Sequence, residues 1–219
     1  MRAEDDTGGF GMIERIKGWL SREAGNWLES LRSMRALRVQ TLTAMLLALT
    51  VVLDYVGGFY LTATVKITPS FLGHAVTGAL LGPFPAMLNG ALADVLMWLI
   101  KPAGAYFPGY TLSGLLGGLL YGVALYRRRG KQLYIGAAAG KLAVNALINV
   151  ALNTYWSSIF VGKAYLALLP ARALKNLIAW PIESVLLILV LLALEKSGIY
   201  QRLGIPGKVS DKSVNTRRN

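Results

Sequence analysis

The sequence contains no cysteine and only one histidine, His74. Without cysteine there is no disulfide, no thiolate metal site and no cysteine nucleophile. A single histidine does not supply the ligand cluster of a zinc site, so we expect no metal and no cofactor bound by this chain. Acidic residues are also few: 11 Asp and Glu stand against 23 Lys and Arg, which gives a net charge of +12.

A phosphate-binding loop is also missing. The segments GAAAGKL (136–142) and GIPGKV (204–209) are too short for the pattern G-x-x-x-x-G-K-[ST] and lack its metal-binding hydroxyl. The chain has no Ser/His/Asp set and no H-E-x-x-H motif. We therefore expect neither ATP hydrolysis nor another enzymatic activity, and a small intramembrane enzyme is the rival class that these absences argue against.

Hydrophobic residues make up 54% of the chain, charged residues only 16%, and the mean hydropathy is +0.48. These values are typical of a polytopic membrane protein with an all-α fold. The basic residues do not alternate with aromatic residues as on a nucleic-acid surface. Their charge instead indicates attraction to the membrane surface and marks topology, and no nucleic-acid partner is expected.

A helix needs about 20 apolar residues to cross a bilayer, and the sequence predicts six candidate helices, several of them shorter than this. The predicted spans are 37–53, 71–81, 85–100, 111–126, 133–155 and 171–194. The densest basic loop is RRRGK, residues 127–131, which the positive-inside rule places in the cytoplasm. That orientation also puts both termini in the cytoplasm of a multi-pass cell-membrane protein.

Residues 1–36 and 196–219 flank this six-helix domain, which we assign to residues 37–195. The first segment spaces Phe10, Ile13, Ile16 and Leu20 as an amphipathic helix does. Such a helix lies on the membrane surface, or it packs on the cytosolic side of the protein itself. The second segment is a basic cytosolic tail.

A polar stripe interrupts the fifth predicted span. Lys141, Asn145, Asn149 and Asn153 follow one another at four-residue intervals, which on a helix places them on one slowly drifting face. Polar residues inside a membrane face the interior or a cavity. We therefore expect the two outer asparagines to line a site and the two inner residues to join helices.

The outer ends of the predicted helices collect aromatic, amide and basic side chains. Basic residues on the outside run against the positive-inside rule and so need another explanation. Together with the aromatic side chains they indicate an anionic, aromatic ligand. The alternative is an aromatic belt with interfacial lysines. The bases are Lys66, Lys101, Lys163, Arg172 and Lys175, and the aromatic residues include Phe59, Tyr60, Tyr106, Phe107 and Tyr110.

Three segments carry a resemblance to a known family: GPFPAMLNGALADVL, YFPGYTLSGLLGGLLYG, and NTYWSSIFVG followed by LPARALKN. Together they resemble the folate-specific substrate-binding (S) component of energy-coupling factor (ECF) transporters, over roughly residues 37–195. The resemblance implies six helices that bind a vitamin from outside and deliver it by docking on a transmembrane coupling subunit driven by two ATPases. It also implies that Ala44 and Ala48, an A-x-x-x-A pair, form the docking surface.

A folate ligand implies roles for particular residues. Amides suit the pterin edge, aromatic rings suit stacking, and a guanidinium suits a glutamate carboxylate. The candidates are Asn89, Asn149 and Asn153 for the pterin edge; Tyr106, Phe107, Tyr110 and Trp156 for the rings; and Arg172 with Lys175 or Lys66 for the carboxylates.

Two acids also fall within the predicted spans, Asp94 and Glu183. A lone charge in a membrane is costly, so we expect either acid to pair with Lys141, while Asp94 could instead contact the pterin amino group. An S component for another vitamin, such as riboflavin, thiamin or pantothenate, remains the alternative within the same fold.

Overall fold

The long apolar runs of the sequence fold into helices that lie side by side. The computed structural model describes residues 7–57, 59–60, 66–102, 104–161 and 165–203. The helices are α1 (Thr7–Ser33), α2 (Leu37–Val56), α3 (Ser70–Leu81), α4 (Pro83–Ile100), α5 (Pro108–Leu125), α6 (Lys131–Ala143), α7 (Asn153–Val161), α8 (Tyr165–Lys196) and α9 (Ile199–Arg202). A short π-helix, η1 (Val144–Leu152), joins α6 to α7.

The predicted all-α fold is confirmed, with one small addition. The loop after α2 contains two antiparallel strands of two residues each, β1 (Phe59–Tyr60) and β2 (Lys66–Ile67). In the described part of the chain, four helical stretches are long and apolar enough to cross a membrane: Leu37–Val56, Pro83–Ile100, Lys131–Ile159 and Tyr165–Lys196. The other two predicted spans correspond to the shorter, apolar α3 and to the glycine-rich α5, so a count of six crossings stays a prediction.

The fifth predicted span is not a regular α-helix. Its central nine residues, which include Asn145 and Asn149, form the π-helix η1. The four-residue stripe was read with α-helical geometry, and that part of the prediction is wrong. A π-helix bonds residue i to residue i+5, which widens the turn, and such segments are frequent at functional sites.

Glycines allow the central helices to approach closely, as small residues commonly do between membrane helices. A Cβ atom added to Gly90 of α4 would lie 2.0 Å from the carbonyl oxygen of Gly114 in α5. A Cβ on Gly118 would lie 2.0 Å from the carbonyl oxygen of Ala86. The backbones of α4 and α5 therefore touch directly, and a larger residue at either glycine would push them apart.

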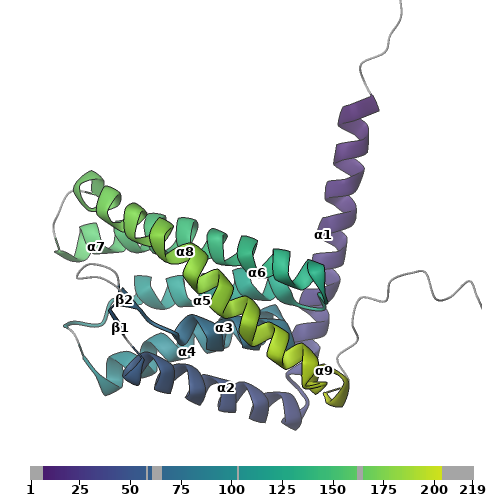
Figure 1. Ribbon diagram of the computed structural model, residues 1–219, viewed down its shortest axis with the longest axis horizontal. Helices are drawn as coiled ribbons and strands as arrows, with labels where there is room; N and C mark the ends of the chain where they lie inside the picture. The colour runs from purple at the N-terminus through teal and green to yellow at the C-terminus, as the bar shows by residue number, and fades with distance from the viewer. Residues whose placement is uncertain (1–6, 58, 61–65, 103, 162–164, 204–219) are drawn as a thin grey trace, which may run out of the picture.

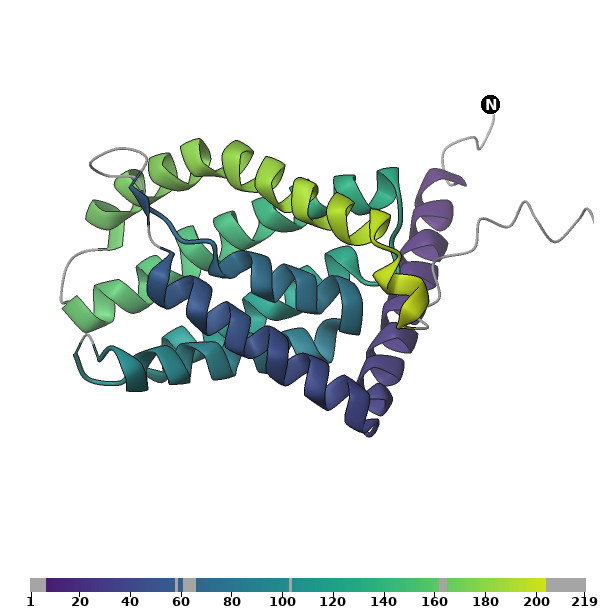
Figure 2. The same cartoon turned by 60° about the horizontal axis from the view of Figure 1, so that its bottom comes forward.

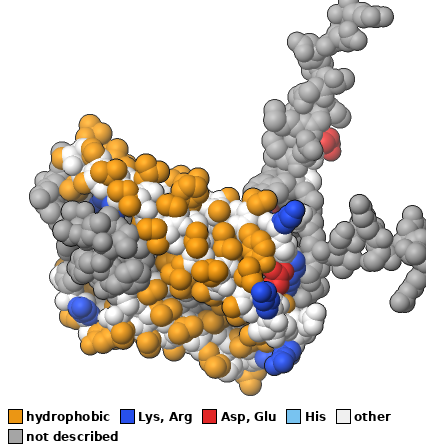
Figure 3. All heavy atoms as spheres, in the orientation of Figure 1, with side chains coloured by type: hydrophobic (Ala, Val, Ile, Leu, Met, Phe, Trp, Pro, Cys, Tyr) orange, Lys and Arg blue, Asp and Glu red, His pale blue; other side chains and the backbone are white. Residues whose placement is uncertain are grey.

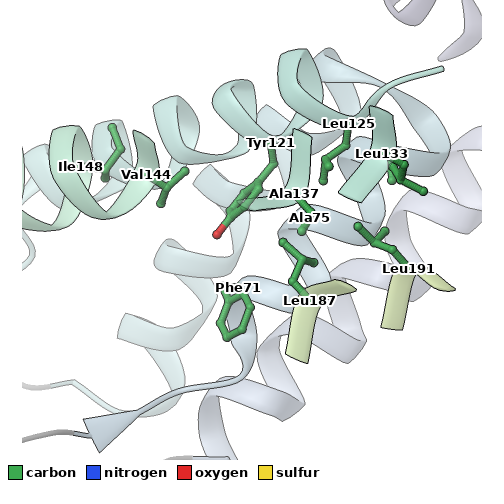
Figure 4. Close-up of a cluster of buried hydrophobic side chains, with 11 residues drawn as sticks. Phe71, Ala75, Tyr121, Leu125, Leu133, Ala137, Val144, Ile148, Leu187 and Leu191 are labelled. Atoms are coloured by element: carbon green, nitrogen blue, oxygen red, sulfur yellow. The ribbon is translucent and has the colours of Figure 1, made fainter. Parts of the chain in front are cut away.

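The outer surface of the bundle is apolar, as expected of a surface that faces lipid. Figure 3 shows hydrophobic side chains over most of the visible face, with the basic side chains near its ends. Large side chains such as Leu37, Ile135 and Leu189 are 78%, 68% and 58% exposed. A buried cluster from α3, α5, α6, η1 and α8 fills the interior; it includes Phe71, Tyr121, Leu133, Ile148 and Leu187 (Figure 4).

Helix α1 crosses one end of the bundle at a steep angle to the other helices (Figures 1 and 2). Its last turns pack on the turn between α3 and α4: Ser30 is fully buried, its Oγ donates to the carbonyl of Leu81, and it accepts from the backbone N–H of Phe84. Trp27 meets the ring of Phe84 edge-on. The end of α1 therefore packs on the protein itself, while the earlier residues extend away from the bundle.

The start of the predicted tail also packs on this end. Tyr200 of α9 is 4% exposed, and the guanidinium of Arg129 lies 3.5 Å from its ring centroid. Glu195 accepts hydrogen bonds from the backbone N–H of Gly130 and the hydroxyl of Tyr134. Residues 204–219 lie outside the described part of the chain.

Candidate functional site

A cavity of about 850 Å³ opens between the helices, toward the end of the bundle opposite α1. Its wall comes from the start of α3, the middle of α4, most of α5, the end of α6, η1 and residues 171–183 of α8. The polar and aromatic lining residues include Asp54, Ser70, Phe71, His74, Asp94, Tyr110, Ser113, Tyr121, Lys141, Asn149, Asn153, Arg172, Lys175, Asn176 and Glu183. This size lies within the range of small-molecule pockets.

Six of the residues proposed from the sequence lie in this wall: Asp94, Tyr110, Asn149, Asn153, Arg172 and Lys175. The helix ends that the sequence places at one level therefore meet around this cavity. Two further bases cannot be placed in the same way. Lys66 belongs to β2, but its side chain lies outside the described part of the structure, as does the whole of Lys163.

Four proposed residues, Asn89, Tyr106, Phe107 and Trp156, are not among the residues that line this cavity. Trp156 and Phe107 pack on each other, with ring centroids 5.7 Å apart. Trp156 donates from Nε1 to the Oγ of Ser113, a lining residue, and Phe107 meets the ring of Tyr110 edge-on. Neither ring is among the lining residues, and both support residues that are.

Tyr106 is 39% exposed and lies further out. Its ring meets Trp98 edge-on, and its hydroxyl is 2.6 Å from the Oγ1 of Thr111. Thr111 in turn donates to the carboxylate of Asp94 over 2.6 Å. Tyr106 thus acts on the cavity through Thr111, which holds Asp94 in the wall.

Arg172 is held in place by Ser157 of α7, which also contacts Tyr110 of α5. One guanidinium nitrogen donates to the Oγ of Ser157 over 2.6 Å, and the hydroxyl of Tyr110 lies 2.9 Å from the same oxygen. Asn176 donates to the backbone carbonyl of Arg172. A guanidinium fixed in this way at a cavity wall is ready to form paired hydrogen bonds with a carboxylate.

The inner part of the cavity holds a buried polar network. The ammonium of Lys141 lies 3.1 Å from the carboxylate of Glu183 and 3.8 Å from the ring centroid of Phe71. Asn145 donates to Glu183 over 3.2 Å, and Asn149 donates to the Oδ1 of Asn145 over 3.0 Å. The predicted pairing of Lys141 with an intramembrane acid is therefore confirmed, and the acid is Glu183.

Asn89, proposed for the ligand edge, is fully buried behind the wall. Its amide contacts Thr77 and His74, and it is His74 that reaches the cavity. Sequence reasoning missed this histidine because a lone histidine in an apolar helix is most simply a core residue. The signal was present: His74 lies three residues after Phe71, on the same helical face as another wall residue.

Among the described residues, no group of three His, Cys, Asp or Glu side chains is placed to hold a metal ion. The wall instead presents fixed cations, carboxylates, amides and one imidazole. Such a set can bind a polar molecule with several hydrogen-bonding edges.

Three kinds of comparison with known proteins agree. The family described as ECF transporter, substrate-specific component, matches residues 37–191. The chain is 37% identical over 126 residues to the folate transporter FolT of Clostridium novyi, covering 58% of this chain and 72% of that protein. It is 30% identical over 150 residues to FolT of Leuconostoc mesenteroides, covering 65% and 78%. A crystal structure of FolT bound with folic acid has a TM-score of 0.59 at 31% identity, covering 68% of this chain and 88% of that one.

Proposed function

The chain belongs to the family of ECF transporter substrate-specific components, and we propose that its substrate is folate or a folate derivative. Membership makes it a membrane-embedded, substrate-binding part of a transporter, not an enzyme, that works with an energising module. The observation that carries the folate assignment is the similarity in sequence and fold to FolT bound with folic acid, at 31% identity and a TM-score of 0.59.

The cavity chemistry supports the same ligand. Folate joins a flat pterin, which donates and accepts hydrogen bonds, to a glutamate with two carboxylates. Arg172 and Lys175 are three residues apart on α8, and both line the cavity. They provide two cations for the two carboxylates, and Arg172 can bind one of them through paired hydrogen bonds.

The other polar and aromatic groups of the wall suit the pterin. Asn149 and Asn153 provide amides, Asp94 provides a carboxylate for an amino group, and Tyr110 provides a flat ring. The Oδ1 of Asn153 is buried without a hydrogen-bond partner among the described residues. An unpaired buried acceptor costs free energy, and a ligand N–H would satisfy it.

Docking on the energising module is proposed for the exposed face of α2. Ala44 and Ala48 are exposed, together with Met45 and Leu49, whereas Thr43 on the same helix is buried. Small side chains at four-residue spacing let another helix approach closely. The face lies away from the cavity, so docking and substrate binding use different surfaces.

The orientation of the chain follows from its charge. Arg127 pairs with Glu29 of α1, and Arg129 packs on Tyr200 of α9, so the basic loop, α1 and α9 share one end of the bundle. Placing this end in the cytoplasm of the cell membrane satisfies the positive-inside rule. The cavity then opens on the outside, where an uptake protein meets its substrate.

The decisive experiment is to identify the small molecule that co-purifies with the detergent-solubilised protein and to titrate the emptied protein with folic acid. Tight, ATP-independent binding of folic acid is expected. Co-purification of a flavin, with no binding of folic acid, would overturn the folate assignment and favour another vitamin.

A second experiment tests the division of labour within the transporter. Reconstituted alone in sealed liposomes, the chain should bind folic acid and accumulate none of it, because it has no phosphate-binding loop. Accumulation by this chain alone, without ATP or partner subunits, would contradict the proposal.

A further inference from the structure

His74 is part of a chain of hydrogen bonds that runs from the core of the bundle to the cavity. The residue lies on α3 and lines the cavity, while its Nδ1 lies 3.1 Å from the Oδ1 of Asn89 on α4. The Nδ2 of Asn89 donates to the Oγ1 of Thr77 over 2.9 Å, and Thr77 donates to the carbonyl of Gly73 over 2.7 Å. Asn89 and Thr77 are both fully buried.

This chain fixes the orientation of every group in it. The hydroxyl of Thr77 has one hydrogen, and a backbone carbonyl such as that of Gly73 can only accept it. Towards Asn89, the oxygen of Thr77 can therefore only accept, so the nearer amide atom must be the nitrogen. The carbonyl oxygen of Asn89 then faces His74, and that oxygen cannot donate.

The tautomer of His74 follows. Its Nδ1 must carry a hydrogen, because the Oδ1 of Asn89 requires a donor. The ammonium of Lys141 lies in the same cavity wall, and a second buried cation there would cost free energy. The ring is therefore a neutral imidazole, with its hydrogen on Nδ1 and a free lone pair on Nε2.

The edge of the ring that carries Nδ1 is turned toward Asn89, which is fully buried and is not part of the wall. Because His74 lines the cavity and is only partly buried, the remaining edge of the ring, which carries Nε2, is the part available to the cavity. We propose that the Nε2 of His74 is the acceptor for an N–H of the ligand's heterocycle, and that His74 thereby selects a ligand with a donor at this position.

This inference rests on the proposed function for the identity of the heterocycle. The pterin of folate has suitable donors, a ring N–H and an exocyclic amino group. The acidic residues of the wall accept hydrogen bonds with a full negative charge, whereas His74 accepts as a neutral group. His74 can therefore accept a hydrogen bond from an uncharged N–H without forming an ion pair. A heterocycle without a donor at this position would leave the Nε2 lone pair unsatisfied.

The first test uses the parent protein. Because His74 is the only histidine in the chain, selective ¹⁵N-histidine labelling gives NMR signals from one imidazole. We expect a protonated Nδ1 and an unprotonated Nε2 without ligand. Adding folic acid should move the Nε2 resonance in the direction of a hydrogen-bonded nitrogen. An Nε2–H tautomer, an imidazolium, or an Nε2 signal that folic acid does not change would overturn the proposal.

The second test separates the two sides of the ring by substitution. His74→Asn retains an amide donor near the position of Nδ1 and removes the acceptor that faces the cavity. His74→Gln retains an acceptor oxygen near the position of Nε2 and gives up the contact with Asn89. By titration, His74→Asn should bind folic acid about 10-fold to 100-fold more weakly, whereas His74→Gln should remain closer to the parent.

The choice of ligand completes the test. Pteroic acid keeps the pterin and lacks the glutamate, so His74→Asn should weaken both ligands by the same factor. A loss for folic acid alone would mean that His74 reads the glutamate, and an equal loss in both variants would mean that it serves the network behind the wall. Either result overturns the proposal for His74. The proposed function is tested separately: it is upheld if the parent protein binds folic acid and fails if the parent does not.

Discussion

The ammonium of Lys141 and the carboxylate of Glu183 lie 3.1 Å apart between α6 and α8, with side chains only 3% and 11% exposed. Asn145 donates to the same carboxylate, and Phe71 covers the ammonium. Two charges buried in an apolar bundle are costly, and each is tolerated only because the other is present. The pair therefore joins two helices at the inner end of the cavity.

Removal of one partner should be much worse than removal of both. Lys141→Met or Glu183→Met leaves an uncompensated buried charge and should destabilise the protein by about 3–5 kcal/mol. The double variant Lys141→Met/Glu183→Met should recover much of that loss. Thermal unfolding of the four proteins in detergent measures the coupling. Additive losses in the double variant would show that the two residues act independently.

Arg172 is predicted to bind a carboxylate of the ligand. Arg172→Ala should weaken folic acid binding by roughly 2–5 kcal/mol, the cost of truncating one partner of a buried charge pair. Arg172→Lys should restore only part of the affinity, because an ammonium cannot form the two parallel hydrogen bonds. Pteroic acid, which lacks the glutamate, is the control ligand and should bind parent and variant alike. Equal weakening of both ligands would assign Arg172 to the fold or the pterin.

The sequence predicted the helices well because their signal is local. Runs such as Leu37–Val56 and Pro83–Ile100 are apolar over their whole length, and hydropathy alone marks them. The helix ends that meet at the cavity were also predictable. Successive spans cross the membrane in alternating directions, and this fixes the membrane depth of residues such as Asn153 and Arg172. Depth, however, does not say which side of the wall a side chain occupies.

That second question depends on contacts between distant residues. Phe107 and Trp156 lie at the correct depth but pack on each other, and Asn89 faces Thr77 and His74 behind the wall. The π-helix η1 was equally hidden, since its sequence, VNALINVAL, is compatible with an α-helix. Packing against α5, α7 and α8, which no local pattern encodes, accompanies the wider turn.

Docking on the energising module should depend on the small side chains of α2. Ala44→Trp or Ala48→Trp should block folate uptake by the complete transporter and leave the affinity for folic acid unchanged, because bulk prevents close helix approach. Ala139→Trp is a matched control, since Ala139 is equally exposed on α6. Uptake assays and titration in detergent measure the two effects. Loss of binding in the Ala48→Trp protein would contradict the separation of docking and substrate surfaces.

Tyr200 gives a prediction about pH. Burial raises the pKa of its hydroxyl to about 12, from an unperturbed value of 10.0. A raised pKa of an acid means that folding favours the neutral form, so this contribution is complete below about pH 10 and is lost as the pH rises toward 12. Tyr200→Phe should reduce the alkaline loss of stability, measured by thermal unfolding at several pH values. It should cost little at neutral pH, because the hydroxyl has no hydrogen-bond partner among the described residues and the ring over Arg129 is retained.

The last prediction concerns α1, whose amphipathic sequence fits the membrane surface. At the bundle, Trp27 contacts Phe84, whereas Leu28 and Leu31 remain 55% and 44% exposed. In the sequence, Leu20 precedes Trp27 by seven residues, the spacing of one face of an amphipathic helix. The steep angle between α1 and the bundle would lay α1 along a membrane that the bundle spans (Figure 1). We therefore expect the first part of α1 to lie in the lipid interface.

The absence of cysteine makes this directly measurable, because each introduced cysteine is the only thiol. Nitroxide labels at Leu20→Cys and Leu28→Cys should be accessible to oxygen, which dissolves in lipid. Labels at Gly18→Cys and Gly25→Cys, where an added Cβ meets nothing within 4 Å, should be accessible to a water-soluble nickel complex. Accessibility to water at all four positions in liposomes would mean that α1 stands free in solution. Protection at Leu20 that arises only when the energising module is added would instead identify α1 as a protein-docking surface.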